Sequence, residues 1–117
     1  MNYSVAQLKK LAQNSPKELA VIITSPNADT HMLALGAELL GSEVRDEQIV
    51  LVALRQLLKH VHALVREGAL TGLSDFYLEK RPPSDILDRL KIMSKTDPSP
   101  DLKEYALSLL RDFDKKL

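Results

Sequence analysis

The chain has 117 residues, of which 44% are hydrophobic and 27% are charged. This length and balance fit one globular domain that buries a core of its own. Sixteen basic residues cancel sixteen acidic ones. That argues against nucleic-acid binding, which usually needs a basic excess, although a local basic patch is compatible with a neutral chain. Cysteine is absent, which excludes disulfides, thiol catalysis and Cys-ligated zinc.

The opening residues lack the pattern of a signal peptide, and the longest apolar run, residues 49–54, is too short to span a bilayer. We therefore expect a soluble cytoplasmic protein without membrane contact. Aromatic residues make up only 4% of the chain, so the core must be built from Leu, Ala, Val and Ile. Such a core suits closely packed helices better than a β-sandwich.

Apolar residues recur at helical spacing along the chain and are interrupted by capping and turn residues, which predicts seven helices. Ser15-Pro16-Lys17-Glu18 is a capping box with Pro at the first helical position, and Gly41 is expected to end the third helix. The turn at residues 97–100 precedes the last helix. The predicted helix starts are Ser4, Ser15-Pro16, Asn27 or Asp29, Asp46-Glu47, Val61, Ser84 and Asp101.

Two of these segments also fit a buried parallel strand, namely residues 19–23 and 49–54. The capping box before the first segment favours a helix. The second apolar run continues through Gln56 to Lys59, beyond ordinary strand length. We therefore predict helices, and we keep a small α/β enzyme as an alternative.

The residues around Ala69 recur 37 positions later around Ala106. This offset also superposes five identical pairs, which are Glu67/Glu104, Leu70/Leu107, Leu73/Leu110, Asp75/Asp112 and Phe76/Phe113. Three further pairs are conservative: Val65/Leu102, Arg66/Lys103 and Thr71/Ser108. A repeat of this length indicates an array of helical units.

The stretches 64–70 and 97–107 resemble the HEAT and armadillo-like repeat family, which shows an Asp-Pro turn, then Val-Arg, then Ala-Leu. Residues 25–35 are a weaker copy, and His60-Val61-His62-Ala63 replaces the Asp-Pro turn of the middle copy. The resemblance spans about residues 16–115. It implies an all-α, short right-handed α-solenoid of about three helix pairs, 15–41, 46–79 and 84–115, with 1–14 as an N-terminal capping helix. It also implies that the second helices line a concave surface that binds proteins or, occasionally, nucleic acid.

Three positions share one exposed face on each second helix of this array. They are Glu67, Thr71 and Ser74 in the middle copy, Glu104, Ser108 and Arg111 in the last, and Met32, Gly36 and Leu39 in the first. We predict a partner-binding face here that is polar in two copies and apolar in the first. The alternative is that Met32 and Leu39 pack against the capping helix.

His31, Arg66 and Lys103 occupy one equivalent position and predict a modest basic ladder. It would meet an acidic partner, or it would pair internally with acidic residues of the next repeat. His60 and His62, with Glu67, raise a metal hypothesis. Residues two apart on a helix point about 200° apart, so the two histidines share an ion only if the turn bends them together.

No nucleophile and base can be paired from the sequence, and the four glycines do not form a phosphate loop. We therefore expect no catalytic residue, metal or cofactor. The predicted function is a non-catalytic protein–protein interaction module, a small adaptor or an assembly subunit that binds through the second-helix face. The first alternative is a nucleic-acid-binding repeat protein that uses the basic ladder. A homodimer through the Met32/Leu39 end is another.

Overall fold

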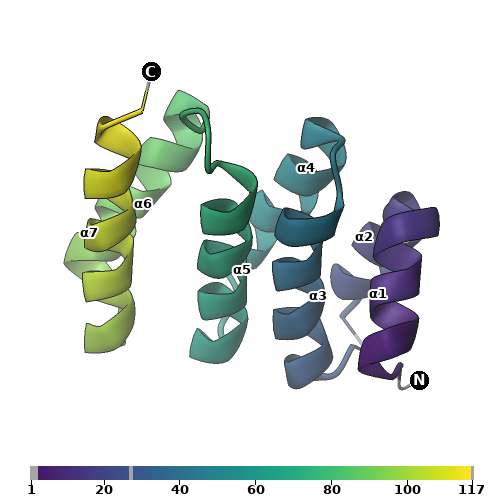
Figure 1. Ribbon diagram of the computed structural model, residues 1–117. Coiled ribbons are helices and arrows are strands. Elements are labelled where there is room, and N and C mark those ends of the chain that lie inside the picture. Colours follow the sequence, from purple (N-terminus) through teal and green to yellow (C-terminus); the bar gives the residue numbers. More distant parts are fainter. Residues whose placement is uncertain (1–2, 27, 117) are drawn as a thin grey trace. The chain divides into compact units, whose positions relative to one another are not determined.

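The computed structural model describes residues 3–26 and 28–116, and every regular element in them is an α-helix (Figure 1). The all-α prediction is therefore confirmed, and the strand interpretation of residues 19–23 and 49–54 is wrong, because both segments are helical. The helices are α1 (Val5–Asn14), α2 (Pro16–Ile23), α3 (Thr30–Glu43), α4 (Glu47–Leu57), α5 (Ala63–Phe76), α6 (Ser84–Thr96) and α7 (Pro100–Asp114).

Side-chain caps begin four of these helices; the sequence predicts the caps at Ser4 and Asp29 and a helix start at Asp46, but it does not predict the cap at Ser99. Ser4 and Gln7 form a reciprocal capping box at α1. Asp29 accepts two backbone N–H groups at the start of α3, and Asp46 does the same at α4. Ser99 accepts the backbone N–H of Leu102 at the start of α7. Each cap satisfies donors that a helix start leaves without an intrahelical partner.

Several predicted boundaries are corrected. α5 begins at Ala63 and not at Val61, and α7 begins at Pro100 and not at Asp101. The Ser15 side chain makes no capping hydrogen bond, so the predicted capping box does not form, and Pro16 alone marks the start of α2. The residue that precedes α6 is Pro83, and Ser84 is already helical. α3 runs two residues past Gly41, because that glycine packs against another helix instead of ending its own. Asn27, the other predicted cap of α3, lies outside the described residues.

The chain divides into two compact units, Met1–Phe76 with α1 to α5 and Tyr77–Leu117 with α6 and α7. In the first unit, α3 packs between α1 and α5, and α2 packs beside α4 (Figure 1). These contacts give two layers, one of α1, α3 and α5, and one of α2 and α4. Leucines fill the space between the layers, among them Leu19, Leu40, Leu54 and Leu70, all fully buried.

Small residues bring α3 and α5 into backbone contact. A Cβ atom on Gly68 would lie 2.5 Å from the carbonyl oxygen of Ala34, and one on Gly41 would meet the backbone of Gly72. A Cβ atom on Gly72 would in turn meet the carbonyl oxygen of Ala37. The two helices run in the same direction, since both series of contacts ascend together. The absence of a large side chain at Ala34, Gly68 and Gly72 is what allows this close approach.

The second unit is a pair of packed helices. The buried rings of Tyr77 and Phe113 meet edge to face, with 6.4 Å between their centroids. In the turn between α6 and α7, the buried Asp97 accepts the backbone N–H of Ser99 at 2.9 Å. This Asx-type bond fixes the chain directly before Pro100. The turn predicted at residues 97–100 is present, but it ends at Ser99 because Pro100 is already helical.

Candidate functional site

The second-helix face of the first unit carries more negative charge than the sequence indicates. Glu67 is exposed on α5, and Thr71 and Ser74 are half-buried beside it. The fold adds Glu38 from α3 and Asp75 from α5. Burial raises the pKa of Glu38, and the charges of Asp75 and Glu67 raise it further. Burial also raises the pKa of Asp75. The sequence does not reveal Glu38 as part of this face, because its position depends on how α3 and α5 pack.

The apolar end predicted for this face does not form. Met32 is only 8% exposed, and a Cβ atom on Gly36 would point at the Ile23 side chain of α2. This side of α3 therefore belongs to the core, and the alignment that places Met32 and Gly36 on one face with Glu67 and Thr71 is wrong. Leu39 is half-buried.

The predicted residues of the second unit lie in a different setting. Lys103, Glu104, Ser108 and Arg111 are all exposed on α7. The 37-residue repeat therefore pairs two different environments at one position, since Arg66 is buried and its equivalent Lys103 is exposed.

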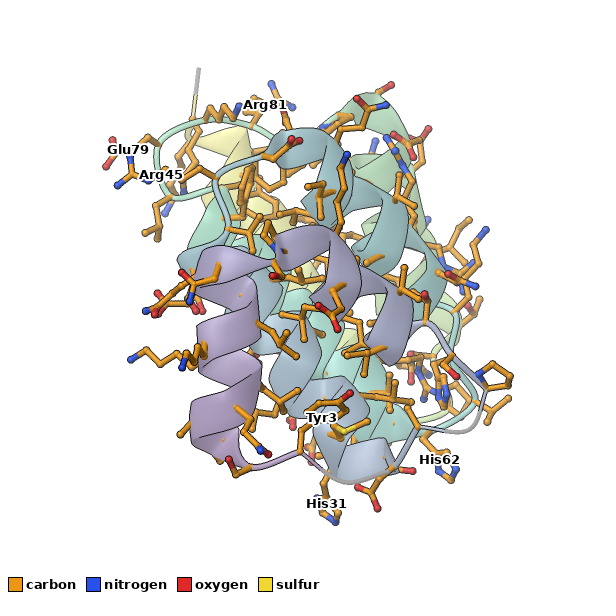
Figure 2. All side chains as sticks on the ribbon, turned by 90° about the vertical axis from the view of Figure 1, so that its right-hand side faces the viewer. Tyr3, His31, Arg45, His62, Glu79 and Arg81 are labelled. Atoms are coloured by element: carbon orange, nitrogen blue, oxygen red, sulfur yellow. The ribbon has the colours of Figure 1, made fainter. Side chains whose placement is uncertain are left out.

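Arg66 holds the turn between α4 and α5 in place of forming a surface ladder. Its Nη1 donates to the carbonyl oxygens of His60 at 2.8 Å and Val61 at 2.9 Å, and the residue is only 8% exposed. His31 is exposed. Figure 2 shows His31 and His62 at the end of the first unit where α3 and α5 begin. Arg66, the middle residue of the predicted ladder, therefore binds the protein's own backbone and is not part of a surface ladder.

His60 and His62 lie in the turn before α5, and not on the helix itself. Their rings stack with 5.6 Å between centroids, and the backbone N–H of His62 donates to Nδ1 of His60 at 3.1 Å. The turn does bend the two rings together. Among the described residues, however, no third acidic or histidine side chain joins them in a group that could hold a metal ion.

We expect the stability of the protein to fall as the pH drops below neutrality. Burial, followed by the charges of His62 and Arg66, lowers the pKa of His60 from its ordinary 6.5. Between the lowered pKa of folded His60 and the ordinary 6.5 of the unfolded chain, the unfolded chain binds more protons than the folded one. The free energy of unfolding therefore rises with pH in this range, and the contribution of His60 is fully present above pH 6.5. A series of denaturant titrations from pH 5 to 8 should show this slope. His60→Asn, whose amide oxygen can accept the same N–H, should flatten it, and an unchanged slope would contradict this origin.

Glu38→Gln should stabilise the protein at pH 7. The pKa of Glu38 in the folded protein is raised above 4.5. Between 4.5 and this raised pKa the folded chain binds more protons than the unfolded one, so stability falls as the pH rises through this range. Removing the charge should raise the free energy of unfolding by about 0.2–0.5 kcal/mol. The gain is small because the carboxylate is largely solvated. Thermal unfolding would measure the gain, and 1 M salt should reduce it. Glu79→Gln, at an exposed position outside the helices, is the control and should have less effect.

The other layer of the first unit carries an apolar groove between α2 and α4. Ala20 and Val21 line it from α2, and Ile49 and Val52 line it from α4. Lys17, Asp46 and Gln48 complete the lining, and the groove has a volume of about 490 Å³. Val21 is 69% exposed and Val52 is 61% exposed. Two large apolar side chains that project from neighbouring helices form a surface that water solvates poorly.

The sequence analysis missed this groove because Val21 and Val52 belong to apolar runs, which usually indicate buried residues. A signal exists nonetheless. Val21 lies two residues from both Leu19 and Ile23, which are fully buried. A helical residue two positions from a buried one points to the far side of the helix. The helix predicted for residues 19–23 therefore places Val21 opposite Leu19 and Ile23, and only the fold shows that no other helix covers that side.

A second, smaller hollow of about 320 Å³ lies on α1, lined by Tyr3, Gln7, Lys10, Leu11, Asn14 and Ser15. Figure 2 shows Tyr3 beside the start of α1. This hollow is lined from one helix and the residues flanking it, whereas the groove lies between two helices. It therefore offers less apolar surface than the groove between α2 and α4.

We found no matching family model, curated protein or solved structure for this chain. The described residues contain no helix that is long and apolar enough to cross a membrane.

Proposed function

We propose that this protein is a non-catalytic protein–protein interaction module, an adaptor or an assembly subunit. The observation that carries the proposal is the exposed apolar groove between α2 and α4. Exposed apolar patches rimmed by polar residues are typical of protein-binding sites. The proposal differs from the sequence-based expectation in its surface, because the second-helix face is polar and acidic while the groove is apolar.

We infer further that the helices are HEAT-like pairs in a short right-handed solenoid, with α1 as the cap. Two observations within the first unit support this. The second helices α3 and α5 lie side by side, as do the first helices α2 and α4, and α1 packs on α3 (Figure 1). The 37-residue repeat supports α6 and α7 as a third pair. In such an array each pair contacts its neighbours and leaves both layers open for binding.

Nucleic-acid binding through the ladder of His31, Arg66 and Lys103 is the weaker alternative. The Arg66 guanidinium already binds two backbone carbonyls. The carboxylates of Glu38 and Glu67 lie on the same layer and would repel phosphate.

We expect Val21→Asp/Val52→Asp to abolish capture of the partner without unfolding the protein. Both side chains are largely exposed, so the folded state should lose little stability, whereas two charges in the groove cannot be desolvated on binding. The measurement is photo-crosslinking in lysate of the source organism, with a benzophenone amino acid at Gln48 in the groove and, separately, at Thr71 on the second-helix face. Adducts are identified by mass spectrometry.

The matched control for the double variant is Val5→Asp, which charges a valine that is 62% exposed on α1, away from the groove. It should keep every adduct. A partner trapped from Gln48 and lost in the double variant supports the proposal. A partner trapped only from Thr71 would mean that the interface is the second-helix face. If the only captured material is removed by nuclease, the partner is a nucleic acid.

A further inference from the structure

We propose that the turn between α4 and α5, residues 58–62, is a pH-sensitive switch, which neutral His60 holds closed and protonated His60 opens while the rest of the first unit stays folded. The inference does not depend on the proposed function, because it needs no partner. It follows from a closed set of hydrogen bonds in the turn, from the charges around the His60 ring, and from the burial on either side of the turn.

Residues 60–66 are joined by hydrogen bonds into a closed set. Nδ1 of His60 accepts the backbone N–H of His62 at 3.1 Å. The carbonyl oxygen of His62 accepts the backbone N–H groups of Val65 and Arg66, both at 3.2 Å, and so begins α5. Nη1 of Arg66 then donates back to the carbonyl oxygens of His60 and Val61. The His60 ring therefore fixes the residue on which the first turn of α5 rests.

This set of hydrogen bonds needs His60 in its neutral form. A neutral imidazole has one nitrogen that accepts a hydrogen bond, whereas both nitrogens of the protonated ring are donors. Protonated His60 would direct an N–H group at the N–H group of His62, and the bond at 3.1 Å would become a repulsive contact. The two imidazole rings stack with 5.6 Å between centroids, so a charge on His60 also lies against the His62 ring.

The charges around the His60 ring disfavour a proton on it. Burial lowers the pKa of His60, and the charges of His62 and Arg66 lower it further. Figure 2 shows His31, at the start of α3, at the same end of the first unit as His62. The Asp29 carboxylate caps α3 by accepting two backbone N–H groups. The other titratable groups within the nearest two turns of helix along the chain are Arg55 on α4, Lys59 in the turn and Glu67 on α5. A proton on His60 therefore joins two positive charges that already act on its ring.

Burial on either side confines the opening to the turn. Leu58 and Val65 are both fully buried. Between them, His60 is half-buried, and residues 59 and 61–64 are exposed. Water can therefore replace Nδ1 of His60 at the N–H group of His62, so opening the turn costs no more than one ordinary hydrogen bond. The buried side chains of Leu58 and Val65 keep the ends of α4 and α5 in the core while the turn opens.

The test is amide hydrogen exchange at pH 7 and pH 5, measured by NMR and divided at each pH by the rate in a short unstructured peptide with the same local sequence. The His62 amide should lose about two- to tenfold of its protection at pH 5, the net contribution of one hydrogen bond. The amides of Leu54 and Leu70, whose side chains are fully buried, should stay far better protected than the His62 amide at both pH values. His60→Asn, whose amide oxygen can accept the same N–H at either pH, should keep the His62 amide protected at pH 5.

The matched control is His31→Asn, which replaces an exposed histidine at the same end of the first unit and should leave the pH response as in the wild type. Equal protection of the His62 amide at the two pH values would overturn the inference. Exchange of Leu54 and Leu70 as fast as that of His62 at pH 5 would also overturn it, because the protein would then open as a whole. A pH response that persists in His60→Asn, or that disappears in His31→Asn, would assign the switch to another group.

Discussion

Gly41→Ala should lower the free energy of unfolding by about 1–3 kcal/mol, the usual cost of forcing a methyl group into a packed site. Alanine is the better helix former by about 1 kcal/mol, so on propensity alone the change would stabilise α3. The packing term is expected to win because the new Cβ atom meets the backbone of Gly72 and not a side chain that can rotate. α3 and α5 would have to move apart. Chemical denaturation followed by circular dichroism measures the loss.

Two neighbouring variants calibrate this result. Gly36→Ala places its methyl group against the fully buried side chain of Ile23, which is β-branched and stiff, so this variant should also lose stability. Ser42→Ala changes an exposed residue of the same helix and should be close to neutral. If Gly41→Ala matched Ser42→Ala in stability, the backbone contact between α3 and α5 would be refuted.

Arg66→Met should destabilise the protein by about 1.5–3 kcal/mol, the range for losing hydrogen bonds to a charged group. The variant keeps the aliphatic stem and removes the guanidinium that donates to the carbonyls of His60 and Val61. Hydrogen exchange should accelerate in residues 58–66, which form the turn between α4 and α5. The charge of Arg66 also contributes to the lowered pKa of His60, so NMR titration should show that pKa move back toward its ordinary value.

The matched control for this prediction is Lys103→Met. The 37-residue repeat places Lys103 at the equivalent position of α7, but its side chain is exposed, so the change should be almost neutral. Equal losses from the two variants would mean that Arg66 stabilises the fold through general packing and not through the turn.

The groove and the second-helix face give the first unit two different surfaces. The groove between α2 and α4 carries two exposed valines, with Lys17 and Asp46 in its lining. On the layer of α3 and α5, burial and then the charges of Asp75 and Glu67 raise the pKa of Glu38.

The sequence by itself determined the helices and most of their starts. Ser4 and Asp29 cap helices as predicted, and Asp46 lies at a predicted helix start, because a cap is a local interaction between a side chain and the next turn. Gly68 and Gly72 are a further local signal, because only residues without large side chains allow the backbones of two helices to touch, as they do here. Both signals are readable because neither needs a distant partner to be identified.

Only the tertiary structure decided which side of each helix faces solvent. Val21 and Val52 are apolar in sequence and exposed in the fold, whereas Arg66 is charged in sequence and buried. Hydrophobicity records what a residue prefers, but exposure depends on which neighbouring helix covers it. The arrangement of α2 beside α4 leaves the two valines open, and the turn before α5 places two carbonyl oxygens where the Arg66 guanidinium can reach them.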